Sequence, residues 1–245
     1  MPQIITDMPE IALAAERVFE IFGFPIANTI IASWLTMLIL VVISFLATRN
    51  MKLVPTGLQN VVEMVLEMFY TGVAEQRAGD KARLVFPFAA TIFFFILISN
   101  WLGALLPGFG TIGFLEHHHG KEVLVPFLRS ACSGLNTTLA LALFSVIGSQ
   151  IYGIKAVGFG YLRRFLSFMG PLEVFDELAK LLSFSFRLFG NIFAGEVLLI
   201  VIALLLPFVA PLPFIALELF VGFIQAFIFA TLTMIFLTAA TAHHG

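Results

Sequence analysis

Charged residues are scarce in this sequence. Asp, Glu, Lys and Arg make up only 11% of its 245 residues, against roughly 25% in a typical soluble domain. Hydrophobic residues account for 60% of the chain, and its mean hydropathy is +1.04. No soluble fold hides that much apolar surface, so the sequence predicts an integral membrane protein.

Other features that the sequence lacks exclude further classes of function. A lone Cys132 excludes an internal disulfide and is expected to be an inert thiol. No Gly-rich phosphate-binding loop is found, so any ATP chemistry belongs to other chains, and a net charge of −2 gives no reason to expect nucleic acid. The adjacent histidines at 117–119 lack a fixed geometry, so neither a metal site nor a cofactor is expected.

Long uncharged runs identify the membrane segments. Each matches or exceeds the ~20 residues that cross a bilayer core, and together they predict an all-α protein with five membrane helices. The runs cover residues 21–48, 84–115, 130–154, 197–217 and 219–242. Acidic residues before the first run, and no small-residue cleavage site after it, favour a retained anchor over a cleaved signal.

The chain divides into an external N-terminal segment, residues 1–25, and a single membrane domain, residues 26–245. Residues 57–76 carry one apolar and one polar stripe, which predicts an amphipathic helix lying flat on a membrane face. The five spans are assigned to residues 26–48, 84–106, 135–154, 172–206 and 214–242.

The last two spans are too long to cross a bilayer upright. Residues 172–206 contain no proline, and a helix of that length extends about 52 Å at 1.5 Å per residue, against a core of about 30 Å. Residues 214–242 pose the same problem. The two are therefore predicted to form a long, strongly tilted hairpin.

The distribution of Lys and Arg predicts the orientation. With the N-terminus outside and the C-terminus in the cytoplasm, nine of the 13 basic residues lie in inner loops and three in outer segments. The remaining one is Arg187, which lies inside a span.

Three ionisable side chains lie within the last two spans: Arg187, Glu196 and Glu218. An Arg in the membrane costs on the order of 3 kcal/mol on insertion scales, which makes it a functional candidate. One helical stripe joins it to Ser183, Gly190, Asn191 and Ala194. Glu196, nine residues on, falls on the opposite face, so the two are not expected to pair.

An antiparallel hairpin turning near Leu206 would bring residues of the two helices to common levels. It predicts that Glu196 meets Glu218 and that Arg187 meets Gln225. Two neighbouring carboxylates in a low dielectric cannot both ionise cheaply, so one is expected to bind a proton, as a relay requires. The permanently charged Arg187 is expected to act as a gate that repels free protons and attracts a partner's carboxylate.

These segments carry a specific motif. The stretch SFSFRLFGNIFAGE at 183–196, followed by QAFIF at 225–229, resembles the a subunit of the rotary (F-type) ATP synthase membrane sector. Supporting features are Asn100, LNTTLALAL at 135–143 and Glu173, and the resemblance covers roughly residues 30–242.

The resemblance implies a proton-translocating stator subunit that is not catalytic by itself. Arg187 would face the carboxylates of the rotating c-ring. The outer half-channel would be lined by Asn191, Glu196, Glu218 and Gln225, and the inner one by Ser183 and Glu173. Implied partners are the c-ring, the peripheral-stalk b subunits and the remaining ATP synthase subunits, in the lipid bilayer of a bacterial cell membrane.

Two other readings remain open on the residues alone. A self-contained transporter would use Glu196 and Glu218 as coupling carboxylates, although no internal repeat supports it. In a purely structural subunit, Arg187 would only pin helices together.

Overall fold

Long apolar helices build the fold. The computed structural model describes residues 17–21, 24–105, 113–118, 121–126, 129–162, 165, 168, 170–206 and 209–242. Within them, five helices are long and apolar enough to cross a membrane, as predicted. These are Asn28–Thr48, Leu58–Leu105, Leu135–Val157, Gly170–Ala203 and Pro211–Thr241.

The elements follow one another in a simple order. The helices are α1 (Asn28–Thr48), α2 (Leu58–Phe69), α3 (Glu75–Ala78), α4 (Ala82–Leu105), α5 (Leu135–Val157), α7 (Gly170–Leu205) and α8 (Pro211–Ala242). A π-helical turn, η1, covers Tyr70–Ala74, and 3-10 turns cover η2 (Gly79–Lys81), η4 (Ala131–Ser133) and η5 (Gly158–Leu162).

Two short β-hairpins were not predicted. Strands β1 (Arg17–Ile21) and β2 (Phe24–Ala27) pair antiparallel at the end of the N-terminal segment. Strands β3 (Gly113–His118) and β4 (Lys121–Pro126) pair where the sequence predicted only a polar loop. A local antiparallel pairing satisfies backbone groups that a loop would leave to water, and it needs little apolar periodicity.

The amphipathic segment is less regular than the sequence predicts. Helix α2 ends at Phe69, and the π turn η1 separates it from α3. Phe69 is buried against the rings of Phe86 and Phe93, whereas Leu58 and Val61 on the predicted apolar stripe stay exposed. After α3 the chain turns at Gly79, which has a positive φ of 52°, and through η2 it enters α4.

Helices α4, α5, α7 and α8 pack together as the core. Helix α8 contacts both α4 and α5, and α5 also packs against α7. Phe184 of α7 contacts two rings of α8, with centroids 4.7 Å from Phe229 and 5.4 Å from Phe236. These contacts hold α7 and α8 side by side as an antiparallel pair.

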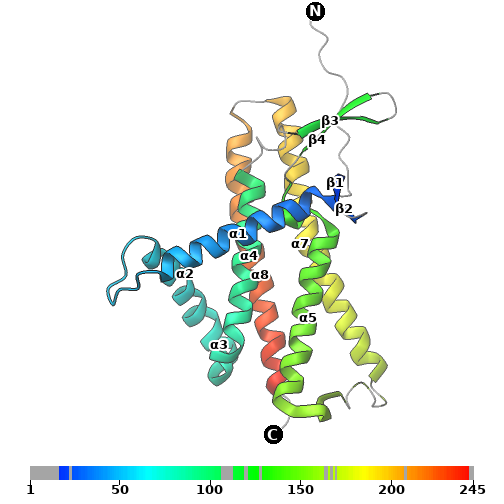
Figure 1. The fold of residues 1–245 in the computed structure, drawn as a ribbon. Coiled ribbons are helices and arrows are strands. Elements are labelled where there is room, and N and C mark those ends of the chain that lie inside the picture. Colours follow the sequence, from blue (N-terminus) through cyan, green and yellow to red (C-terminus); the bar gives the residue numbers. More distant parts are fainter. Residues whose placement is uncertain are drawn as a thin grey trace, which may run out of the picture.

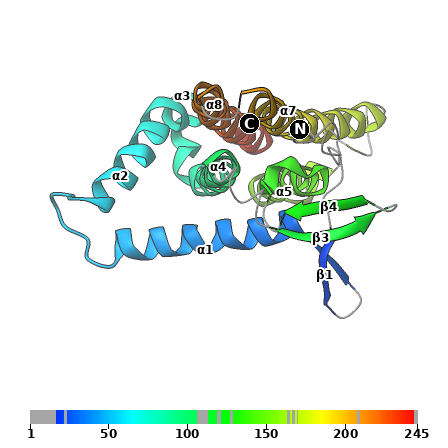
Figure 2. The same cartoon turned by 90° about the horizontal axis from the view of Figure 1, so that it is seen from above.

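Helix α1 runs across this bundle rather than along it, which both views show (Figures 1 and 2). Its 21 residues extend about 31 Å, close to the thickness of a bilayer core. The 36 residues of α7 and the 32 of α8 extend about 54 and 48 Å. Much of α1 carries exposed large apolar side chains, including Leu38, Val41 and Phe45, as expected of a surface that faces lipid.

Candidate functional site

Arg187 lies on the exposed face of α7. Its stripe is solvent-accessible throughout, since Ser183, Gly190, Asn191 and Ala194 are exposed as well. The guanidinium Nη2 donates a hydrogen bond to Ser183 Oγ at 3.3 Å. No carboxylate among the described residues pairs with it. A charged side chain inside an apolar span is costly, which makes Arg187 a candidate functional residue.

Glu196 lies on another side of α7 and is paired with Arg129. Glu196 Oε2 lies 2.9 Å from Arg129 Nε, and both side chains are nearly buried, at 16% and 14% exposure. Arg129 also lies over the ring of Phe193, 5.8 Å from its centroid. Arg187 and Glu196 therefore form no pair, as predicted. Glu196 is paired instead with Arg129, a cation from a different segment.

Glu218 of α8 packs against the same level of α7. Its Oε1 lies 2.9 Å from where a Cβ on Gly195 would be, so any larger residue there would have to displace this carboxylate. The Glu218 side chain is buried, and it interacts electrostatically with Glu196. The two carboxylates thus share one level of the hairpin, as the antiparallel estimate predicted.

Asn191, one helical turn after Arg187 on α7, pairs with Gln225 of α8. Asn191 Nδ2 donates to Gln225 Oε1 at 2.7 Å. The hairpin estimate placed Gln225 opposite Arg187, and that pairing is wrong by about one helical turn. The sequence estimate assumed a symmetric turn, whereas the actual offset of α8 is set by side-chain packing between the helices.

Asn100 of α4 borders the same region. Its Nδ2 donates to the carbonyl of Gly222 at 3.1 Å, and a Cβ on Gly222 would lie 3.0 Å from Asn100 Cβ. Three buried polar atoms here find no protein partner among the described residues: Asn100 Oδ1, Glu218 Oε2 and Gln225 Nε2. Buried polar groups left by the protein are normally satisfied by ordered water.

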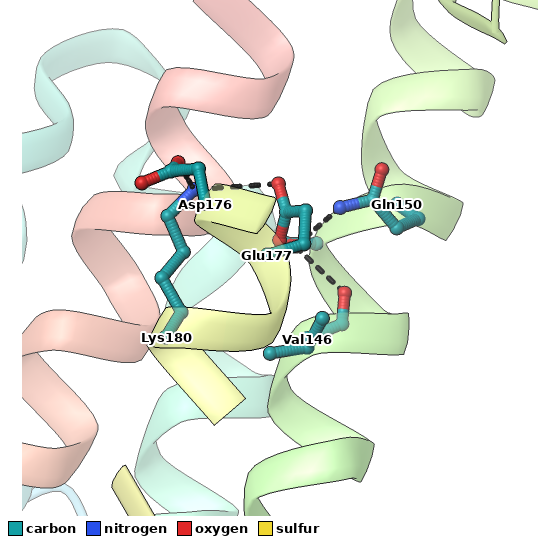
Figure 3. A network of polar contacts seen from close by, with 6 residues as sticks. Val146, Gln150, Asp176, Glu177 and Lys180 are labelled. Atoms are coloured by element: carbon teal, nitrogen blue, oxygen red, sulfur yellow. Dashed lines mark hydrogen bonds and ion pairs between the residues drawn. The ribbon is translucent and has the colours of Figure 1, made fainter. Parts of the chain in front are cut away.

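A second polar cluster lies at the other end of α7 (Figure 3). Lys180 Nζ lies 2.6 Å from Asp176 Oδ2 and 3.3 Å from Glu177 Oε1. Across from them on α5, Gln150 Nε2 donates to Ser149 Oγ at 3.4 Å, and Ser149 Oγ donates to the carbonyl of Val146 at 2.7 Å.

A cavity of about 210 Å³ opens between α5 and α7 beside this cluster, and Gln150 and Glu177 are among its lining residues. The predicted inner residue Glu173 instead lines a separate hollow on α7, together with Asp176. Arg187 and Ser183 therefore lie along α7 between two polar regions that do not touch each other.

Comparison with known proteins decides the family. The family model described as "ATP synthase A chain" matches residues 30–238. The chain belongs to this family. It is 37% identical over 233 residues to "ATP synthase subunit a" of Moorella thermoacetica, covering 94% of this chain and 96% of that one. It is 34% identical over 243 residues to "ATP synthase subunit a, chloroplastic" of Stigeoclonium helveticum, covering 97% and 94%.

Arg129 is the member of the site that reasoning from the sequence missed. It had been counted as one of three basic residues of the outer segments, although it lies only six residues before the helix α5 begins. The available signal was electrostatic: a carboxylate deep in an apolar span, such as Glu196, requires a cation or a proton. Its pairing across 67 residues cannot be read from local spacing.

Cys132 provides a test of how tightly this part of the family fold is packed. Its side chain is fully buried, and burial raises the pKa of the thiol to about 12. Because the thiolate is the reactive form, we expect no maleimide labelling of the native protein at pH 8 and complete labelling after denaturation. Mass spectrometry over a time course measures both. Fast labelling of the native protein would show that this segment opens readily.

Proposed function

We propose that this chain is the proton-translocating stator subunit of an F-type ATP synthase, and that it supplies two offset half-channels to a rotating c-ring. The observation that carries the proposal is the exposed stripe around Arg187, which lies between two separate polar regions. A positive charge placed there stops protons from passing directly between the regions. Protons cross only when a ring carboxylate carries them.

The outer half-channel is assigned to Glu196, Glu218, Asn191 and Gln225. The orphaned polar atoms of Glu218, Asn100 and Gln225 support it, because water bridging them would connect the carboxylates to the exposed stripe. A proton arriving at Asn191 would then be passed to a ring carboxylate, which enters the lipid in its neutral form.

The inner half-channel is assigned to Ser183 and Glu173, on the other side of Arg187. After nearly a full rotation, the protonated ring carboxylate would reach Ser183. The positive charge of Arg187 favours its deprotonation, and the proton leaves towards the inner end of α7. The chain carries out no covalent chemistry, so ATP synthesis itself is assigned to other subunits of the complex.

The direction of α1 supports a strongly tilted hairpin. If α1, whose length fits the bilayer, stands close to the membrane normal, α7 and α8 must incline steeply, since α1 runs across them (Figure 1). Tilting also accommodates helices of about 50 Å in a core of about 30 Å. Two sites at different positions along a steeply tilted α7 are then displaced from each other in the plane of the membrane. The two half-channels would therefore meet the ring at different points of its circumference. We assign the N-terminus to the outside and the C-terminus to the cytoplasm of a bacterial cell.

The proposal is tested by reconstitution. We expect the chain to purify with the c-ring and the peripheral-stalk b subunits, to show no proton flux alone in vesicles, and to support ATP-driven proton pumping in the whole complex. A pH-sensitive dye inside the vesicles measures the flux. Specific flux through vesicles that contain only this chain would favour the self-contained transporter instead.

A further inference from the structure

The outer half-channel holds more negative than positive charge. Within the described residues, α8 carries one charged side chain, Glu218, and the part of α7 beyond Arg187 carries one, Glu196. Helix α1 carries none, and the single charge of α4, Arg83, lies in its first turn at the opposite end. Arg129 is paired with Glu196, and it is the only cation in the described ranges that is paired with either carboxylate. The nearby Cys132 is a neutral thiol.

Arg129 engages one of these carboxylates and not the other. It holds Glu196 at 2.9 Å and is supported by the Phe193 ring. The ion pair with Arg129 therefore stabilises Glu196 as an anion in a fixed position.

Glu218 has the opposite surroundings. Its side chain is only 8% exposed, and Oε2 has no hydrogen-bond partner among the described residues. It packs against the backbone of Gly195 and faces the negative charge of Glu196. A carboxylate without a cation or donor avoids the cost of burial by binding a proton.

We propose that Arg129 is a positioning residue of the outer half-channel, which holds Glu196 as an anion and so makes Glu218 the carboxylate that binds the incoming proton. This assignment rests on the proposed function. In the wild type, the charges of Arg129 and Glu196 offset each other at Glu218. Removing either one leaves a net charge beside Glu218 and changes how readily it binds a proton.

The test uses the whole complex in vesicles, with ATP synthesis measured against the pH on the outer side. Arg129→Gln is expected to move the midpoint of this pH dependence up by about one pH unit, because Glu196 and Glu218, left without a cation, then bind their first shared proton at a higher pH. Glu196→Gln is expected to move it down by about the same amount, since only the cation remains. The double substitution is expected to return the midpoint to that of the wild type, and Arg129→Lys to leave it unchanged.

Controls separate this role from a structural one. Arg49→Gln removes an exposed arginine at the end of α1 and is expected to leave the midpoint unchanged, and all rates are normalised to assembled complex. An unchanged midpoint in Arg129→Gln would overturn the proposal, and so would a double variant that keeps the shift of either single one. The proposed function fails on a different readout, which is substantial ATP synthesis without Arg187.

Discussion

Replacing Arg187 with alanine is expected to abolish ATP synthesis in a complex that still assembles. The side chain is exposed, and its hydrogen bond to Ser183 lies within one turn of α7. Among the described residues its loss breaks no hydrogen bond or ion pair between helices, so we expect the fold to persist. What disappears is the positive charge that separates the two half-channels. We expect the rate of ATP synthesis to fall at least about 100-fold, which corresponds to about 2.7 kcal/mol of activation free energy.

Rates of ATP synthesis and of passive proton flux, both normalised to assembled complex, measure this effect. Passive flux is expected to rise as synthesis falls, because protons then pass between the half-channels without rotation. Arg187→Lys distinguishes charge from geometry, since lysine carries the charge but loses it more easily in an apolar setting. If an assembled Arg187→Ala complex synthesised ATP at the normal rate, Arg187 would have only a structural role between helices.

Replacing Glu196 with glutamine is expected to slow proton uptake from the outer side about tenfold or more. The amide keeps the shape of the side chain but removes the negative charge that attracts protons into the outer half-channel. It also leaves Arg129 as a nearly buried cation without its counter-charge, which opposes the arrival of further protons. ATP synthesis driven by an imposed pH gradient measures the loss.

Glu67→Gln is the matched control, because Glu67 is an exposed carboxylate on α2, far from the hairpin in sequence. It is expected to leave the rate unchanged. If Glu196→Gln retained the wild-type rate at every outer pH, Glu196 would not belong to the proton path.

Features that depend on neighbouring residues were predictable. The five apolar helices follow from uncharged runs, because the cost of placing charge in lipid acts on every residue of a span. The stripe from Ser183 to Ala194 follows from the 3.6-residue repeat, and it is exposed as one face. The family followed from the motif around Arg187, which the match to residues 30–238 confirms.

Features that depend on pairing between distant segments were not. The β3–β4 hairpin and the π turn after Phe69 are local, but they were also not predicted, because they have no strong signature in the sequence. The partner of Gln225 was predicted as Arg187 and is Asn191, because the offset between two packed helices depends on how their side chains interlock.

The sequence by itself determined that this is a membrane protein with five apolar helices, that one arginine lies within a span, and which family it belongs to. Those properties rest on hydrophobicity, helical period and motif, which are local. Only the tertiary structure decided that Arg129 pairs with Glu196, while Glu218 is paired with no cation in the described part of the chain. Charge pairing depends on distance in space, and 67 residues separate the two partners along the chain.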